Sequence, residues 1–347
     1  YTDDFVTCTV TPGDGLTTGA PQTASVRVGA STETDDDGES SGVGGSDGSG
    51  GSDSAADDDI TLVIADYEFV GEGSGDNSGY AVANAGDVDG DGLDDLLIGA
   101  RENDDGPSSN AGKAYLFYGK TLSDRTRLNL ARADYSFVGS NGGEYAGWSV
   151  ASAGDVDGDG KADILIGAPN SREGYNWSSG AAYLILESTL SSGDGPDGRI
   201  EHTMSLDDAD YRFLGRHGDH GVGTSVASAG DIDGDDLDDI MIGSRHSTYC
   251  CGYEGQVYVI KASSLGAGST RNIDSADYIL TGESTYDYFG HAMTSAGDVD
   301  DDGKDDILIG AYGNDEVGSN SGMTYLLLGS SFGGDSTMSL ADASYRI

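Results

Sequence analysis

Four short loops in this sequence each bring several carboxylates together. The first lies in AGDVDGDGLDDLLIGA (85–100), where five aspartates fall within nine residues, from Asp87 to Asp95. Carboxylates packed this closely repel one another unless a cation lies among them, and calcium is the expected ion. An EF-hand loop needs a bidentate carboxylate at its twelfth position, where this loop has Ile98. An earlier residue must therefore close the loop.

The same stretch returns three times, as AGDVDGDGKADILIGA (153–168), AGDIDGDDLDDIMIGS (229–244) and AGDVDDDGKDDILIGA (296–311), with successive loops 68, 76 and 67 residues apart. Short runs rich in β-branched and aromatic residues recur around each loop, such as GYAVANAG, DDLLIGA, GKAYLFYGK and ADYSFVG. Turn residues separate these runs, as in β-strand proteins. Four antiparallel strands about every 70 residues predict β-propeller blades. A row of β-sandwiches is the weaker alternative, because about 70 residues is short for one.

These motifs resemble the FG-GAP repeat of integrin α-subunit propellers and of bacterial extracellular proteins. The resemblance covers roughly residues 60–347 and implies an all-β fold, a β-propeller of four-stranded blades at about 60–132, 133–208, 209–275 and 276–347. It also implies about four Ca²⁺ ions in D-x-D-x-D-G-x-x-D loops, bound by four carboxylates and the backbone carbonyl of the seventh residue. The implied ligands are Asp87, Asp89, Asp91, Leu93 and Asp95; Asp155, Asp157, Asp159, Lys161 and Asp163; Asp231, Asp233, Asp235, Leu237 and Asp239; and Asp298, Asp300, Asp302, Lys304 and Asp306.

The residue pattern agrees with this ligand set. Alternate residues of a tight loop can point toward one cation, and glycines such as Gly92 and Gly160 allow the chain to turn with positive φ. Two loops depart from the pattern, with Asp236 at the sixth position and Asp301 at the fourth. Aspartate tolerates left-handed geometry better than most residues, so we expect weaker third and fourth sites. An acidic turn without metal is the alternative. Dockerin and thrombospondin-type arrays lack support, since the twelfth residues are isoleucines and cysteines are few.

The overall composition narrows the possible partners. Asp and Glu outnumber Lys and Arg by 62 to 17, which gives a net charge of −45 and a pI near 4.1. Nucleic acid and anionic membrane surfaces are therefore unlikely partners. No apolar run approaches the ~18 residues that a membrane span requires. Three cysteines are too few for a disulfide framework, and the start at Tyr1 without a visible signal peptide indicates a processed or trimmed chain.

The first sixty residues have a different character. Residues 1–30 contain two alternating runs, FVTCTVTP and TASVRVG, which resemble the last hairpin of a bacterial immunoglobulin-like domain, with Cys8 at an intersheet position. A hairpin alone is marginal in water, so we expect a partial domain. Residues 31–59 hold ten acids and no base, which predicts a flexible, acidic Gly/Ser/Asp linker.

Propeller topology puts the acidic loops on one face and a second group of loops on the opposite face. We expect aromatic and histidine side chains there, from Tyr145, His217, His220, Tyr286, Tyr288 and Phe289. They form either a binding surface or contacts that pack the loops together. His217 and His220 near His246 are a weaker candidate for a transition-metal or catalytic site. Cys250 and Cys251 are adjacent and form either a vicinal disulfide or free thiols, and Asn176 begins the one N-glycosylation sequon.

The leading hypothesis is a secreted, extracellular or cell-surface, calcium-binding structural or adhesive propeller without enzymatic activity. Its predicted partner is a protein or glycan on the face opposite the calcium loops, or neighbouring copies of the chain. The fourth strand motif occurs five times and the others four times. This surplus predicts either a longer array of blades or a fibre assembled by strand sharing. A polysaccharide lyase or hydrolase is the enzymatic alternative.

Overall fold

The computed structural model divides into two compact units, residues 1–62 and 63–347. It describes residues 5–10, 22–27, 66–106, 109–122, 126–172, 179–190, 202–216, 221–245, 253–266, 268–333, 337–340 and 345–346. In the first unit, β1 (Phe5–Val10) pairs antiparallel with β2 (Gln22–Arg27), as the two alternating runs predict. An immunoglobulin-like identity for this hairpin stays a prediction, and the acidic segment 31–59 lies outside the described residues.

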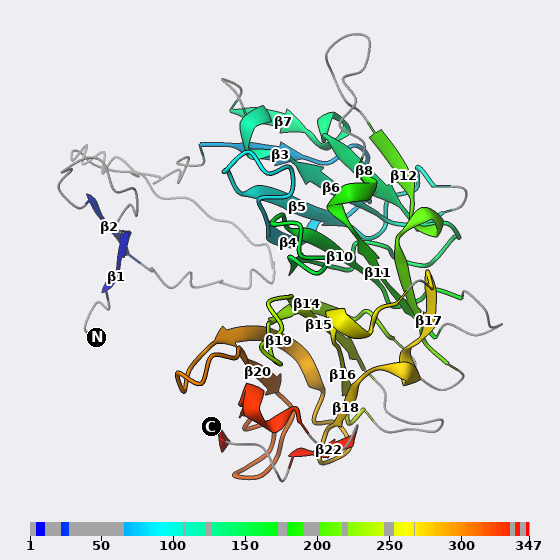
Figure 1. Ribbon diagram of the computed structural model, residues 1–347. Helices are drawn as coiled ribbons and strands as arrows, with labels where there is room; N and C mark the ends of the chain where they lie inside the picture. The colour runs from blue at the N-terminus through cyan, green and yellow to red at the C-terminus, as the bar shows by residue number, and fades with distance from the viewer. Residues whose placement is uncertain are drawn as a thin grey trace, which may run out of the picture. The chain divides into compact units, whose positions relative to one another are not determined.

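The second unit repeats one sheet order four times, which confirms the predicted all-β propeller (Figure 1). The innermost strand of each blade packs beside that of the next blade, in the chain order β4, β9, β14, β19. The four blades, from the innermost strand outward, are β4 (Ser78–Gly86), β5 (Asp95–Ala100), β6 (Lys113–Phe117) and β8 (Tyr135–Val138); β9 (Ser149–Gly154), β10 (Asp163–Ala168), β11 (Ala181–Ile185) and β13 (Tyr211–Leu214); β14 (Ser225–Gly230), β15 (Asp239–Ser244), β16 (Gln256–Ile260) and β18 (Tyr278–Thr281); and β19 (Phe289–Gly297), β20 (Asp306–Ala311), β21 (Met323–Leu327) and β23 (Tyr345–Arg346).

Neighbouring blades approach closely because glycines face one another across the interface. A Cβ atom on Gly99 would lie 2.1 Å from the carbonyl oxygen of Gly147, and one on Gly167 would lie 2.1 Å from that of Gly223. Real Cβ atoms do not tolerate such distances, so only glycine fits at these crossings. Large buried rings fill the sheets around them. One tyrosine from the third strand of each blade is fully buried: Tyr115, Tyr183, Tyr258 and Tyr325.

The ADYSFVG run forms one strand, and a separate short strand precedes it across a turn of 3-10 helix. In the first repeat β7 (Arg127–Asn129) precedes η2 (Leu130–Arg132), and β8 follows. β8 pairs antiparallel with β6 of its own blade. β7 pairs parallel with β3 (Glu68–Val70), which lies ahead of the first blade.

Later repeats use this short strand in the same way. β12 (His202–Ser205), β17 (Thr270–Asn272) and β22 (Thr337–Ser339) pair parallel with β8, β13 and β18 of the preceding blade. The first three blades therefore each gain a fifth, outer strand from the repeat that follows. The helices η4 (Leu206–Asp208) and η6 (Ile273–Ser275) separate the short strand from the strand that follows, as η2 does.

Local hydrogen bonds explain why the chain turns between these two strands. The Asn129 side chain caps η2 by accepting the N–H of Ala131 at 2.9 Å, and Leu130 is buried. Asp134 of the repeated ADY motif then accepts the Tyr118 N–H at 2.8 Å and the Thr121 hydroxyl at 2.7 Å. This carboxylate ties the start of β8 to the end of the third strand. The chain must turn here to make both sets of bonds.

A second set of one-turn helices follows the third strand of each blade. These are η1 (Gly119–Thr121), η3 (Glu187–Thr189), η5 (Ala262–Ser264) and η7 (Gly329–Ser331). No helix in the described ranges has the length and apolar character needed to cross a membrane.

Candidate metal centre

Each acidic loop joins the first and second strands of its blade, so the four loops share one face of the propeller. The carboxylate at the first loop position fixes the turn by accepting backbone N–H groups. In the second loop, Asp155 accepts the N–H groups of Gly158, Asp159 and Gly160 at 2.7, 3.0 and 2.8 Å. The chain therefore wraps around this carboxylate and holds the next acids close to it.

The loops bring acidic side chains into contact range, as the sequence predicts. In every loop three carboxylates offer ligand atoms within 4.8 Å of one another: Asp87, Asp89 and Asp95; Asp155, Asp157 and Asp159; Asp231, Asp233 and Asp239; Asp298, Asp300 and Asp302. The remaining implied carboxylates lie outside these trios: Asp91 and Asp235 in the first and third loops, Asp163 and Asp306 in the second and fourth. Ligation by the carbonyls of Leu93, Lys161, Leu237 and Lys304 stays a prediction.

The carboxylate at the ninth loop position is buried in every blade and has a second, structural role. Asp163 accepts the N–H of Val156 at 3.0 Å, from within the loop, and that of Glu187 at 2.8 Å, from the first residue of η3. Asp95, Asp239 and Asp306 make the same pair of bonds. These residues therefore tie the acidic loop to the helix that follows the third strand.

Burial makes the carboxyls of Asp95, Asp163 and Asp239 hard to ionise. Burial raises the pKa of Asp95 to about 6 and those of Asp163 and Asp239 to about 7. Neighbouring loop carboxylates raise these pKa values further, and the backbone N–H donors lower them only in part. A nearby cation would reverse this effect by favouring the ionised form.

Two carboxylate oxygens give the most direct sign that the loops fit a cation. Oδ1 of Asp89 and Oδ1 of Asp233 are buried and have no hydrogen-bond partner in the described structure. A buried oxygen of this kind is costly unless something binds it. Clusters of oxygen ligands suit a hard cation such as Ca²⁺. The donor set therefore fits the predicted ion.

Basic side chains distinguish the sites from one another. Lys120 contacts Asp89 and lies 3.8 Å from Asp91 in the first loop, and Lys261 lies 3.1 Å from Asp233 in the third. These ammonium groups partly neutralise the acids. At the second loop the added neighbour is Glu187, which pairs with Lys161 at 2.6 Å. Glu187 also contributes to raising the pKa of Asp157, after burial and the other loop acids.

The two aspartates that replace turn glycines keep the loop geometry. Asp236 has φ 66° and Asp301 has φ 61°, in the left-handed region that the glycines occupy elsewhere. The Asp236 N–H donates to Asp231 at 2.8 Å, just as the Gly92 N–H donates to Asp87 at 2.8 Å. Any weakening of the third and fourth sites must therefore come from the cost of this backbone conformation and not from a changed turn.

The opposite face also holds buried carboxylates, which the sequence analysis missed. Asp76, Glu144 and Asp287 are 7, 1 and 2% exposed. Asp287 accepts the Ser284 N–H at 2.9 Å and the side-chain amide of Asn314 at 3.3 Å. Each of these acids accepts a bond from its own loop and one from a neighbouring loop of the same face. They act as staples for the loops.

Aromatic residues gather on this face as predicted, with one correction and several additions. Tyr286 is exposed, whereas Phe289 is 1% exposed and packs inside the core. Tyr288 stacks on Tyr312, with centroids 4.8 Å apart and planes at 2°, and Tyr145 meets Trp148 at 6.3 Å. The histidines 217, 220 and 246, the cysteines 250 and 251 and the sequon at 176 lie outside the described residues.

Arginines join this aromatic cluster, which the sequence did not reveal. Arg101 lies over the rings of Tyr80 and Trp148, and Arg245, from the third repeat, also lies over Trp148. Tyr80 and Trp148 each follow a glycine near the start of the innermost strand, and Arg101 and Arg245 each follow the last residue of the second strand. These repeated positions were the sequence signal that could have indicated the arginine–aromatic cluster.

Comparison with known proteins agrees with the fold and the loops. The FG-GAP repeat family matches residues 78–117, 146–185, 222–260 and 289–327. Integrin alpha-PS2 of Drosophila melanogaster is 28% identical over 246 residues, 69% of this chain and 15% of its own length. Integrin alpha-5 of Xenopus laevis is 29% identical over 245 residues, which are 68% of this chain and 20% of its own length. Integrin alpha-IIb of Homo sapiens is 32% identical over 177 residues, which are 50% of this chain and 15% of its own length. The chain thus spans a fifth or less of the length of these relatives.

The sheet order and the repeated acidic loops define a β-propeller built from FG-GAP repeats. The chain is accordingly an integrin-α-like FG-GAP repeat protein.

Proposed function

We propose that this chain is an extracellular calcium-binding propeller that binds a protein partner and catalyses no reaction. The two buried, unpartnered oxygens in the acidic loops, on Asp89 and Asp233, carry the calcium part of this proposal. Extracellular calcium modules bind at about 0.1–1 mM, and this range suits loops that lack the twelfth-position carboxylate. Similarity to integrin α-subunits supports a protein-binding role.

A direct metal measurement tests the calcium proposal. The protein is dialysed against calcium with excess magnesium, and bound metal is counted by mass spectrometry. We expect about four calcium ions per chain, with one fewer in Asp89→Asn. A matched exchange on the opposite face, Asp104→Asn, should retain all of them, because Asp104 is exposed and lies in a different loop. A chain that retains no calcium contradicts the proposal.

Catalysis has less support within the described residues. There, groups of three or more His, Cys, Asp or Glu side chains occur at the four acidic loops alone. Among the described residues of the opposite face, the buried acids Asp76, Glu144 and Asp287 are each satisfied by donors from the surrounding loops. A screen with polysaccharides and phosphoesters, with and without calcium, tests this point. Turnover that requires this chain would establish the enzymatic alternative.

Self-association is a second candidate, favoured by the outer faces of the first and fourth blades. Val299 is 56% exposed, whereas its counterparts Val88, Val156 and Ile232 are 0, 3 and 0% exposed. Gly79 has open space where Gly147 meets the neighbouring blade. A groove of about 390 Å³ on the fourth blade, lined by Gly310, Tyr312 and Met323 among others, occupies the place that a further blade would fill.

The two outer faces are complementary in hydrogen bonding as well. Between blades, the N–H of Ala162 donates to the carbonyl of Asp87 at 3.1 Å, and the N–H of Asp305 donates to that of Asp231 at 2.8 Å. In the described structure no such bond joins the equivalent Asp94 N–H or Asp298 carbonyl. A second copy can therefore add its first blade to the fourth blade of this one, which would give a fibre.

Sedimentation velocity tests the self-association candidate. We expect concentration-dependent oligomers, and we expect Val82→Arg or Val299→Arg to dissociate them, since both residues are exposed on the outer blade faces. Val317→Arg is the control, because Val317 is 87% exposed in a loop outside these faces. A monomer at all concentrations rules this candidate out.

A further inference from the structure

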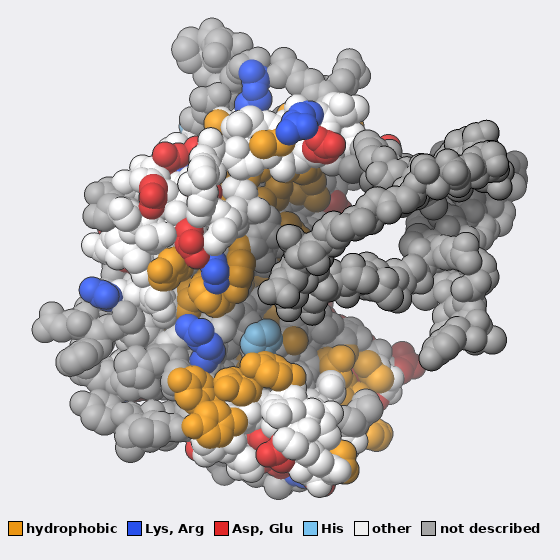
Figure 2. Space-filling model, turned by 180° about the vertical axis from the view of Figure 1, so that it is seen from behind, with side chains coloured by type: hydrophobic (Ala, Val, Ile, Leu, Met, Phe, Trp, Pro, Cys, Tyr) orange, Lys and Arg blue, Asp and Glu red, His pale blue; other side chains and the backbone are white. Residues whose placement is uncertain are grey.

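Two arginines meet at one tryptophan on the face opposite the acidic loops. The guanidinium carbon of Arg101 lies 3.8 Å from the ring centroid of Tyr80 and 4.5 Å from that of Trp148. The guanidinium carbon of Arg245 lies 5.2 Å from the Trp148 centroid. The three blades that supply these residues thus converge on one indole. Figure 2 shows Lys and Arg side chains lying against hydrophobic ones near the middle of the molecule.

Both arginines have bonding capacity to spare. Within the part of the chain that the structure describes, the Nε atoms of Arg101 and Arg245 are buried and have no hydrogen-bond partner. Arg101 makes one ion pair, at 3.1 Å to Glu102, and within the described residues no carboxylate pairs with Arg245. This is unusual in a chain with 62 acids and 17 bases. A guanidinium stacked on a ring points its edge N–H groups away from that ring, and its two terminal nitrogens match a carboxylate in a bidentate geometry.

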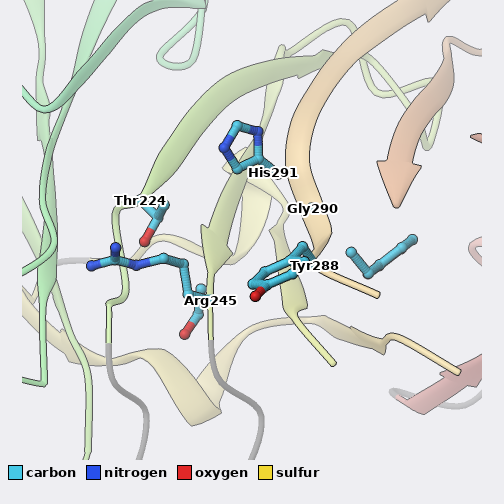
Figure 3. Close-up of a pocket in the computed structure, with 7 residues that line it drawn as sticks. Thr224, Arg245, Tyr288, Gly290 and His291 are labelled. Atoms are coloured by element: carbon cyan, nitrogen blue, oxygen red, sulfur yellow. The ribbon is translucent and has the colours of Figure 1, made fainter. Parts of the chain in front are cut away.

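An apolar surface lies next to the two arginines. Arg245 borders a small pocket with Thr224, Tyr288 and His291, and Figure 3 shows these side chains around one space. The ring of Tyr288 stacks on that of Tyr312, and Tyr312 is 53% exposed. The site therefore offers positive charge and a hydroxyl beside exposed aromatic surface.

We propose that the two arginines bind one carboxylate of a protein partner, an Asp or Glu side chain, with an adjacent apolar or aromatic residue packed on Tyr288 and Tyr312. This inference rests on the proposed function, because it names the chemistry of the partner. A single carboxylate fits better than an acidic polysaccharide. The chain carries a net charge of −45, which repels a polyanion at every point but opposes one charge only weakly across screened distances.

Selection from a library of random seven-residue peptides tests the proposal. The calcium-loaded protein is the target, and its bound calcium is measured in the same sample. We expect enriched peptides to contain Asp or Glu beside an aromatic or aliphatic residue. Calorimetry with an enriched peptide should show about a tenfold or greater loss of affinity when its acid becomes Asn or Gln, and a similar loss for Arg101→Gln with Arg245→Gln.

The control removes the same charge elsewhere. Arg127 and Arg216 pair with Glu68 and Asp274 toward the outer rim, so the double variant Arg127→Gln with Arg216→Gln should bind the peptide unchanged. Both double variants should keep their calcium and melting temperature, which shows that they fold.

Each other outcome has a defined meaning. Enriched peptides without an acid, or equal binding to the Arg101 and Arg245 variant, overturn this inference and leave the proposed function standing. Stronger, equally arginine-dependent binding of polygalacturonate overturns the choice of a single carboxylate. A calcium-loaded protein that enriches no peptide contradicts both the inference and the proposed partner. A protein without calcium contradicts the proposed metal role alone.

Discussion

Buried carboxylates on the two faces of the propeller are satisfied in different ways. On the loop face several acids share one small volume, and oxygens such as Oδ1 of Asp89 have no partner among the described residues. On the opposite face each buried acid stands alone and accepts amide or N–H donors, as Asp287 does from Ser284 and Asn314. The first arrangement favours a bound cation, whereas the second is satisfied by protein donors alone. Under the proposed function, one fold uses the same residue type as a metal ligand and as a fixed staple.

Calcium removal should separate the two faces most strongly. At free calcium tenfold above Kd, each site contributes about 1.4 kcal/mol, so four sites contribute roughly 6 kcal/mol. We expect chelation to lower the melting temperature by roughly 10 °C or more, measured by calorimetry. Adding calcium back should restore it. An unchanged melting temperature would remove the distinction between the faces.

The pH dependence of the calcium-free protein should show the next largest effect. Folding raises the pKa of Asp95 to about 6 and those of Asp163 and Asp239 to about 7, above an unfolded value of about 3.9. Their protonated forms favour folding, so this stability is complete below pH ~4 and is lost as pH rises through 6 to 7. The loss is on the order of a few kcal/mol for Asp163 or Asp239 alone.

Calcium should cancel that trend, because it binds the ionised carboxylates. The stabilisation by saturating calcium should therefore grow from pH 5 to pH 7.5, as measured by thermal melts at matched ionic strength. A calcium-free protein that becomes more stable over this range contradicts the prediction.

Removing a staple on the opposite face should destabilise the protein by the same amount with or without calcium. Glu144 is 1% exposed and accepts the Ser140 N–H at 3.0 Å and the Asn141 amide at 2.7 Å. Glu144→Ala leaves these donors unpaired, which costs about 1–3 kcal/mol. Urea unfolding with calcium and with chelator measures the difference. Asp163→Ala is the counterpart, since its cost should fall once calcium is removed.

The smallest expected effects rank the four sites. The turn glycines predict that Asp95→Ala or Asp163→Ala costs more calcium-dependent stability than Asp239→Ala or Asp306→Ala. Lys120 modifies this order, because its ammonium contacts the first loop. Lys120→Ala should raise calcium affinity there by about two- to fivefold, as expected for a partly exposed ion pair. Isothermal titration measures the change, and Lys304→Ala is a control in a loop where no Lys304 ion pair is seen among described residues.

The sequence predicted the repeated features and missed those that depend on neighbouring blades. The repeated D-x-D-x-D motif and the short apolar runs were sufficient for the propeller and for the convergence of Asp87 and Asp89, because these depend on local spacing. The outer strands were missed because β12 pairs with β8 of another repeat, and a run of four residues carries no sign of that pairing. Trp148 and Arg245 were missed for a similar reason, since only the shared axis brings them together.

The outer strand that each repeat gives to the preceding blade has a consequence for synthesis of the chain. β8 cannot receive its parallel partner β12 until the following repeat has left the ribosome. Each of the first three blades therefore emerges with an unpaired edge and is completed only one repeat later. These three blades are therefore completed in the order in which they are translated. Each of their edges is exposed to unwanted pairing only while about 70 further residues are made.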